Sequence, residues 1–343
     1  MCEEREPISI SIVLPVFNVT DHIERCVQSV MSQSFPCTEC IIVDDASTDD
    51  SIAKCEQLID SYRGPIEFKI LHHELNRGLS AARNTGTDAA TSDYILYLDS
   101  DDELTPDCLE KLSQSVYDDA SVEMVLGYYD YITNDHPTVY NKQHLRRRVN
   151  INSLEAVRNY FYNNEGWFPI QVWNKLVKRD FLVRNHIAFI EGILFEDNPW
   201  TYSVFKYLSH LYIVPEITYH YYKRADSIWI SSTLEVKAKY FGMIFEGFAS
   251  DFTPGEEARE ASFYLRNFCQ YYLNYPEMPP YKRTADRFKK ALQDGHHKKE
   301  LVFLFLTEQA SKTSIGRFLF PFVLKARIAL LYPFRRLTSL KAN

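Results

Sequence analysis

Residues 95–102 read Ile95-Leu-Tyr-Leu-Asp-Ser-Asp-Asp102, an apolar run that leads directly into the carboxylates of Asp99, Asp101 and Asp102. Carboxylate oxygens at a strand end suit Mg²⁺ or Mn²⁺, ions that usually combine one or two protein carboxylates with the phosphate oxygens of a substrate. For this short motif alone, the alternative is a solvated turn with an aspartate cap before Pro106. The surrounding sequence has to decide between the two interpretations.

The sequence on either side alternates between strand and helix patterns. Apolar runs predict strands at 8–17, 40–43, 67–71 and 94–98, and helical spacing or capping residues predict helices at 21–33, 49–62 and 79–90. This alternation predicts an α/β fold with a Rossmann-like, mostly parallel sheet and helices on both faces. Neither G-x-G-x-x-G after the first strand nor G-x-x-x-x-G-K-[ST] occurs, so a dinucleotide or P-loop site loses most of its support.

Polar clusters follow three of these strands, as Pro15-Val-Phe-Asn18, Asp44-Asp-Ala-Ser47 and Asp99-Ser-Asp-Asp102. In open α/β sheets, ligands bind at the carboxyl ends of strands, near the point where the strand order reverses. We therefore expect the three segments to converge on one crevice.

Individual residues of this crevice leave two interpretations open. Asp44 and Asp45 can accept hydrogen bonds from a nucleobase or ribose, or form a turn and a helix cap. Phe17 suits either stacking on a base or ordinary core packing. Segment 76–86 packs small residues around Arg77 and Arg83, and a guanidinium here suits either a diphosphate or an exposed helix face.

The composition describes a globular protein that divides into a main domain and an appendage. The chain has 343 residues, of which 45% are hydrophobic and 24% charged. Its net charge of −8 argues against general affinity for nucleic acid. The seven cysteines are irregularly spaced, which favours reduced thiols, and Cys37-Thr-Glu-Cys40 lacks the second pair of a zinc site. We expect a cytoplasmic protein, because neither a signal peptide nor an 18-residue apolar run is found.

The C-terminal third has a different character. Beyond about residue 234, aromatic residues at helical spacing predict helices with a packed core. From Ser311 to the end the chain carries seven Lys/Arg and no Asp/Glu. Within this part, 318–336 mixes bulky apolar residues with cations, a composition that suits either a membrane interface or a helix docked on the protein itself.

Four motifs, in order and in spacing, closely resemble the N-terminal domain of family 2 glycosyltransferases, and the resemblance covers roughly residues 8–225. They are Ser11-Ile-Val-Leu-Pro-Val-Phe-Asn18, Ile41-Ile-Val-Asp-Asp-Ala-Ser-Thr-Asp49, Asn76-Arg-Gly-Leu-Ser-Ala-Ala-Arg-Asn-Thr-Gly86 and Tyr97-Leu-Asp-Ser-Asp-Asp102. The resemblance implies a GT-A fold, a nucleotide-diphosphate sugar donor, uridine by default, and a divalent cation held by the D-x-D motif.

The resemblance also implies roles for individual residues. Asp101 would bind Mn²⁺ or Mg²⁺, and Asp197 matches the catalytic base. Glu196 would bind acceptor hydroxyls or tune the pKa of its neighbour, although both carboxylates also suit a cap of the helix ending near Leu208. The residues expected to bind the nucleotide sugar are Pro15, Val16, Phe17, Asn18, Asp44, Asp45, Arg83, Asp99 and Ser100.

Two later segments match the same family. Trp173 and Lys175 lie in a Trp-x-Lys-Leu stretch that would line the acceptor side, or would form a strand with one buried tryptophan. Candidates for closing over the diphosphate are Tyr222, Arg224 and Ser227. The family often has arginine where this chain has Lys223, which cannot form a bidentate fork, so the phosphate role at 223 is in doubt.

The sequence therefore predicts a GT-A domain over 1–233, with a nucleotide-sugar half at about 8–125 and an acceptor half at about 126–233, and a helical region with a basic amphipathic tail over 234–343. The predicted function is an inverting, metal-dependent transfer of a single sugar to a glycan or lipid-linked glycan in cell-surface polysaccharide synthesis, with peripheral contact at the inner membrane face through 316–336. A nucleotidyltransferase and a non-catalytic sugar-nucleotide-binding assembly protein are the alternatives. The sequence gives no oligomeric state.

Overall fold

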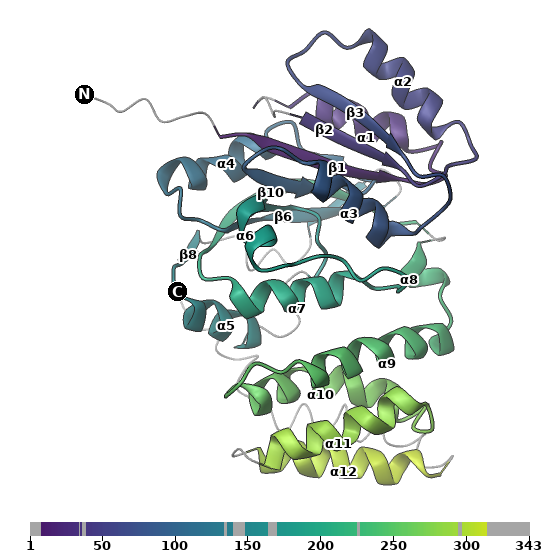
Figure 1. Ribbon diagram of the computed structural model, residues 1–343, viewed down its shortest axis with the longest axis vertical. Coiled ribbons are helices and arrows are strands. Elements are labelled where there is room, and N and C mark those ends of the chain that lie inside the picture. Colours follow the sequence, from purple (N-terminus) through teal and green to yellow (C-terminus); the bar gives the residue numbers. More distant parts are fainter. Residues whose placement is uncertain are drawn as a thin grey trace. The chain divides into compact units, whose positions relative to one another are not determined.

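The computed structural model describes residues 8–33, 35, 39–133, 136–139, 148–163, 170–224, 227–293 and 297–313 (Figure 1). Cys37 and the segment 316–336, for which the sequence makes predictions, lie outside these residues. The chain divides into two compact units, Met1–Ser231 and Ser232–Asn343, and each is described by itself.

A mixed sheet of ten strands forms the centre of the first unit in the part of the chain that the structure describes. The strand order is β3-β2-β1-β4-β9-β6-β10-β5, and β7 and β8 pair with β6 and β10. The bounds are β1 Ile10–Val16, β2 Glu39–Asp44, β3 Glu67–His72, β4 Tyr94–Tyr97, β5 Glu103–Leu104, β6 Met124–Thr133, β7 His136–Val139, β8 Val149–Ile151, β9 Lys175–Lys178 and β10 Leu211–Tyr222.

Strands β3, β2, β1 and β4 pair in parallel, as do β6 and β10. β9 lies between β4 and β6 and is antiparallel to both, so β6 and β10 run in the same direction as the first four strands. The predicted α/β fold with a mostly parallel sheet is confirmed. The order reverses at β1, whose neighbours are β2 and β4, and this places the carboxyl ends of these three strands at one crevice.

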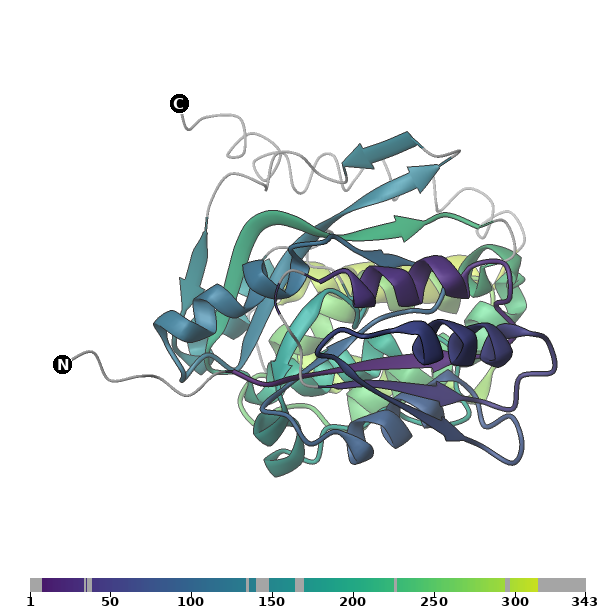
Figure 2. The same cartoon turned by 90° about the horizontal axis from the view of Figure 1, so that it is seen from above.

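Helices cover both faces of the β3-β2-β1-β4 half, with α1 and α2 on one face and α3 on the other (Figures 1 and 2). Gly86 explains how closely α3 approaches β1, because a Cβ atom at this position would overlap the Val13 side chain. The helices of this unit are α1 Ile23–Met31, α2 Ser51–Ser61, α3 Leu79–Ala89, α4 Cys108–Asp118, α5 Leu154–Asn163, α6 Arg179–Arg184, α7 Asp197–Tyr207 and α8 Ile228–Ser231.

The pattern of β1 shows why the segment forms a central strand. All seven of its residues are buried, as expected for a strand with helices on both sides. Ile12 and Leu14 belong to the core cluster that also contains Val27 of α1, whereas Val13 points to α3. Burying each such aliphatic side chain contributes about 1.5–3 kcal/mol.

The second unit is helical, which confirms the predicted C-terminal helical region. Its helices are α9 Leu234–Ser250, α10 Glu257–Tyr272, α11 Pro279–Gln293 and α12 Lys298–Ser311. Phe245 and Phe288 both pack on Phe268, and all three are buried, so these aromatic residues belong to the core of the unit. No helix in the described ranges is both long and apolar enough to cross a bilayer.

Candidate functional site

The acidic cluster after β4 is the first part of the site. Asp99, Asp101 and Asp102 each place a carboxylate oxygen within 4.8 Å of the others. Asp102 is fully buried and accepts hydrogen bonds from Tyr219 Oη at 2.7 Å and from Tyr222 N at 2.8 Å. Asp99 and Asp101 keep 25% and 20% of their side chains exposed, so these two side chains remain partly accessible.

The charge of this cluster suits a divalent cation. Burial raises the pKa of Asp101, and the neighbouring Asp99 raises it further, while Arg224 opposes the shift. The pKa of buried Asp102 is also raised, first by burial and then by Asp101 and Asp99. A bound cation would stabilise the ionised form of these crowded carboxylates. Carboxylate oxygens are also the ligands that Mg²⁺ and Mn²⁺ prefer.

Arginine side chains lie against Asp101. Arg224 Nε is 2.8 Å from Asp101 Oδ2, and Arg25 Nη2 donates to the Asp101 carbonyl oxygen at 2.7 Å. The Arg25 guanidinium lies 3.5 Å from the ring centre of Tyr222, whose hydroxyl donates to Glu103. Two of the predicted residues, Tyr222 and Arg224, are therefore placed beside the acidic cluster.

Arg83 joins the acidic cluster to the Glu196–Asp197 pair. Its side chain is only 1% exposed, and its Nη2 lies 2.7 Å from Asp99 Oδ1. Its Nη1 lies 2.7 Å from Glu196 Oε1 and 3.1 Å from Asp197 Oδ1. Burial alone would lower the pKa of Arg83, but the three carboxylates raise it, so the guanidinium stays charged. One buried cation thus brings together carboxylates that follow β4 and carboxylates that begin α7.

Asp197 and Lys175 have shifted pKa values at this site. Burial raises the pKa of Asp197 to about 7, against the opposing effect of Arg83. Lys175 is fully buried, its Nζ donates to the Gln171 carbonyl oxygen, and burial lowers its pKa to about 7 while Asp197 opposes that shift. A carboxyl group that titrates near neutral pH is suited to general base catalysis.

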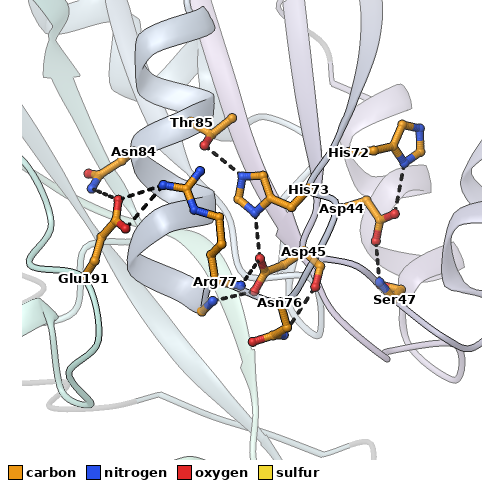
Figure 3. Close-up of polar contacts among 11 residues, drawn as sticks. Asp44, Asp45, Ser47, His72, His73, Asn76, Arg77, Asn84, Thr85 and Glu191 are labelled. Atoms are coloured by element: carbon orange, nitrogen blue, oxygen red, sulfur yellow. Dashed lines mark hydrogen bonds and ion pairs between the residues drawn. The ribbon is translucent and has the colours of Figure 1, made fainter.

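Asp44 and Asp45, at the end of β2, have different environments (Figure 3). Asp44 accepts from Ser47 N at 2.8 Å and lies 3.0 Å from His72 Nδ1. Burial would raise the pKa of Asp44, but the hydrogen bonds from His72 and Ser47 outweigh it and lower the pKa. The Asp44 carboxylate therefore remains ionised at the crevice.

Asp45 ties β2 to the beginning of α3. Its carboxylate accepts from Arg77 N at 2.8 Å and from Gly78 N at 2.7 Å, and it contacts His73 Nδ1 at 2.7 Å (Figure 3). Gly78 has a φ of 89°, a conformation that favours glycine. Through these contacts, Asp45 stabilises the loop that precedes α3.

The end of β1 contributes exposed and buried residues. Phe17 is 45% exposed and Asn18 is also exposed, so both are accessible to a ligand. Asn18 Oδ1 accepts from Thr48 N at 2.8 Å, which joins the loops after β1 and β2. Pro15 and Val16 are buried in the strand, and Ser100 is 8% exposed.

Trp173 lies in the core. It is 4% exposed and stacks on Tyr219 with ring centres 4.4 Å apart, and Tyr129 meets it edge to face at 4.7 Å. Of the two interpretations left open by the sequence, this position supports the buried tryptophan, and the residue precedes β9 instead of lying in the strand.

Asn84 is a functional candidate that the sequence interpretation missed. Its Nδ2 donates to the Phe189 carbonyl oxygen at 2.9 Å, and its Oδ1 accepts from Phe189 N at 2.9 Å. Beside it, Arg77 Nη2 is 3.3 Å from Glu191 (Figure 3). α3 therefore holds the segment that leads to Glu196 and Asp197. The sequence feature that could have identified Asn84 is its position next to Arg83 in the motif 76–86.

Comparison with known proteins identifies the family of this chain. The family model "Glycosyl transferase family 2" matches residues 11–181. EpsJ of Bacillus subtilis, an uncharacterized glycosyltransferase, is 29% identical over 220 residues, which are 64% of this chain and 62% of EpsJ. TuaG of the same species, a putative teichuronic acid biosynthesis glycosyltransferase, is 35% identical over 120 residues, or 35% of this chain and 46% of TuaG. The matches therefore span less than two thirds of either relative.

Among solved structures, residues 1–349 of S. aureus TarS in complex with UDP-GlcNAc superpose with a TM-score of 0.64 and 18% identity, covering 89% of this chain and 92% of that one. At this identity the likeness concerns the fold alone. The sheet, its crevice and the family match define a glycosyltransferase of the GT-A type. Through residues 11–181, the chain belongs to glycosyl transferase family 2.

Proposed function

We propose that the protein is an inverting glycosyltransferase that moves a single sugar from a nucleotide-diphosphate donor, by default a UDP-sugar, to a hydroxyl group of a glycan or lipid-linked glycan. The observation that carries the proposal is the Arg83 guanidinium, which contacts Asp99 on the donor side and Asp197 on the acceptor side. A donor-binding carboxylate and a base are thereby within the reach of one side chain. Direct displacement at a sugar carbon needs this closeness.

In this proposal, Asp197 accepts the proton of the acceptor hydroxyl as its oxygen attacks the anomeric carbon. The bond between that carbon and the diphosphate oxygen breaks, and its electron pair leaves with the nucleoside diphosphate. Attack from the face opposite the leaving group inverts the anomeric centre. Arg83 and Lys175 favour the carboxylate form of Asp197, because both lower its pKa.

Binding of the donor is assigned to the residues around the crevice. Asp44, at the end of β2, would accept hydrogen bonds from the nucleoside, and Phe17, which is 45% exposed after β1, would stack on its base. Asp101, with Asp99 beside it, would hold Mn²⁺ or Mg²⁺. When bound, the ion would neutralise negative charge on the diphosphate oxygens. Arg224 is the candidate for a further diphosphate contact.

The acceptor and the cellular setting are proposed from relatives and from charge. TuaG is described as a teichuronic acid biosynthesis enzyme, which supports a role in cell-surface polysaccharide synthesis. TarS forms a complex with UDP-GlcNAc, which supports a UDP-sugar donor. For the basic segment 316–336 we propose peripheral contact with an anionic membrane on the cytoplasmic side.

The test of the function uses the Asp197→Asn variant. Asparagine keeps the shape of the side chain but cannot take the acceptor proton, so we expect transfer to fall by about 10³-fold or more. UDP binding in the presence of Mn²⁺ should be retained, giving about 2.7 kcal/mol of stabilisation when UDP is present at 100 times its dissociation constant.

Transfer and UDP-induced thermal shift are measured on the same preparations. Loss of UDP binding in Asp197→Asn would remove Asp197 from the role of base. Wild-type protein that neither binds UDP nor hydrolyses any UDP-sugar would refute the proposed donor class. The Asp101→Asn variant is the matched comparison, because we expect it to lose Mn²⁺-dependent UDP binding.

A further inference from the structure

An unusual group of large apolar side chains lies exposed on α8. Ile228, Trp229 and Ile230 are 48%, 54% and 57% exposed. Among the tryptophans that the structure describes, Trp173 and Trp200 are 4% and 1% exposed. Three consecutive exposed apolar residues keep a large area in water, and such patches mark contact surfaces.

Trp229 is held in a fixed orientation by Phe195. The two rings meet edge to face, with centres 5.5 Å apart and an angle of 81° between their planes. Phe195 has a φ of 65°, which is uncommon for an aromatic residue. Its carbonyl oxygen accepts from the backbone and side-chain nitrogens of Asn198, both at 3.1 Å, and these bonds hold the turn.

This aromatic pair lies next to the carboxylates of the site. Phe195 directly precedes Glu196 and Asp197, and consecutive Cα atoms are about 3.8 Å apart, so two peptide units separate Phe195 from the proposed base. The segment is fixed to α3 by the paired hydrogen bonds between Asn84 and Phe189. The exposed indole therefore contacts the residue that directly precedes Glu196 and Asp197.

We propose that Trp229, positioned by Phe195, is a stacking platform for a pyranose ring of the acceptor, an inference that rests on the proposed function. A pyranose has a face of C–H groups and a rim of hydroxyls, and an indole offers a flat apolar face. A sugar lying on Trp229 keeps its hydroxyls at the rim, and in this proposal one of them is the hydroxyl that Asp197 deprotonates. The ligand class is a terminal hexopyranoside, and the site is distinct from the donor-binding residues at the ends of β1 and β2.

A membrane anchor is the competing explanation for exposed isoleucine and tryptophan near Lys223 and Arg224. The binding free energy of a membrane anchor comes from buried apolar area alone, so an anchor needs no fixed ring orientation. The contact between Trp229 and Phe195, in a turn held by Asn198, favours the sugar.

The test is saturation-transfer difference NMR with the methyl glycosides of glucose, galactose and N-acetylglucosamine, in the presence of UDP and Mn²⁺. Wild-type protein should transfer saturation to the C–H protons on one face of at least one glycoside. We expect Trp229→Ala to weaken this binding about tenfold and Trp229→Phe to retain most of it. Ile230→Ala is the matched control, because it removes similar exposed area without the aromatic face.

Unchanged glycoside signals in Trp229→Ala would overturn the proposal, as would the absence of signal from every glycoside in the wild type. Co-sedimentation with phosphatidylglycerol vesicles is measured in parallel. If Trp229→Ala and Ile230→Ala lose vesicle binding equally while the glycoside signals stay intact, the patch is a membrane anchor. This result would also overturn the sugar-platform proposal. UDP affinity should be the same in all variants. A wild type that fails to bind UDP would count against the proposed function and not against the platform.

Discussion

At the scale of single residues, the guanidinium of Arg83 lies among three carboxylates and is almost completely buried. Removing one partner of a buried ion pair leaves an uncompensated charge, which costs about 3–5 kcal/mol. Arg83 therefore has a structural role, because Asp99, Glu196 and Asp197 would repel one another without its positive charge. The role at the diphosphate that the sequence suggested for Arg83 stays a prediction.

The pH dependence of transfer follows from Asp197. Because its pKa is raised to about 7, mainly by burial, the fraction of carboxylate increases as the pH rises through that value. We expect kcat/KM for transfer to increase with pH over this range. Lys175→Met removes a charge that lowers the pKa of Asp197, so the acid limb should move to higher pH and the rate at neutral pH should fall about two- to tenfold.

The measurement is the pH profile of kcat/KM for the wild type and the Lys175 variant, with circular dichroism to check folding. Lys175→Arg is the control, because it keeps a cation at the position. An acid limb that moves to lower pH, or does not move in Lys175→Met, would contradict electrostatic coupling between Lys175 and Asp197.

Arg224 and a divalent cation should compete for Asp101. Arg224 Nε lies 2.8 Å from Asp101 Oδ2, a pair that is about one quarter exposed. Because partly exposed pairs contribute up to about 1 kcal/mol, Arg224→Gln should bind Mn²⁺ about two- to fivefold more tightly without nucleotide. Electron paramagnetic resonance of free Mn²⁺ measures this affinity directly.

An Mn²⁺ affinity of Arg224→Gln that is unchanged or weaker would show that Arg224 does not compete with the metal for Asp101. Arg224→Lys is the control and should resemble the wild type.

At the scale of elements, α3 connects both sides of the site. Its Arg83 and Asn84 contact the segment before α7, while the loop before it is held by Asp45 at the end of β2. The small residue Gly86 lets the helix lie close against β1. The motif 76–86 therefore connects the end of β2 with the segment before α7.

Asn84→Ala should separate donor binding from transfer. The variant loses both hydrogen bonds to the Phe189 backbone, at a cost of about 1–3 kcal/mol in stability. We expect a lower kcat, because the segment bearing Asp197 is less well fixed, with UDP affinity unchanged. Asn84→Asp is the matched control, since it keeps the acceptor for Phe189 N and loses only the donor.

Thermal unfolding, steady-state kinetics and UDP titration report on these effects together. An equal loss of UDP affinity and kcat would indicate that α3 acts through the donor site instead of through the segment before α7.

At the scale of the whole molecule, charge is unevenly distributed along the chain. Everything from Ser311 onward carries Lys and Arg without Asp or Glu, whereas the chain as a whole has a net charge of −8. Cations near an anionic bilayer each contribute about 1 kcal/mol. We expect full-length protein to bind phosphatidylglycerol vesicles in a salt-dependent manner.

The variant Lys325→Glu/Arg327→Glu reverses two of these charges in the full chain. Vesicle co-sedimentation should fall by about tenfold or more, while UDP binding should not change. Lys289→Glu/Lys290→Glu, on α11, is a comparison at positions outside the segment. Binding that is unaffected by the reversal at 325 and 327, or by removal of 316–343, would exclude the membrane role of this segment.

Much of the first unit could be predicted from sequence because its signals are local. The strands expected at 40–43, 67–71 and 94–98 and the helix at 79–90 agree with β2, β3, β4 and α3 to within two residues at each end. Burial on both faces requires continuous apolar runs, and the helices show apolar residues at helical spacing. For the Trp-x-Lys-Leu stretch a strand was one of the two interpretations left open, but its antiparallel place between β4 and β6 was not predicted, because β9 enters the sheet from a distant part of the chain.

By itself, the sequence determined the α/β class, the order of strands and helices up to residue 98, and the family, since each depends on periodicity and on short motifs with fixed spacing. Only the tertiary structure decided which charges meet. Arg83 and Glu196 are 113 positions apart, and Asn84 and Phe189 are 105 apart. Strand order and helix packing bring such residues together, and no local pattern encodes them. For the same reason the burial of Trp173 and the exposure of Trp229 became visible only in the folded chain.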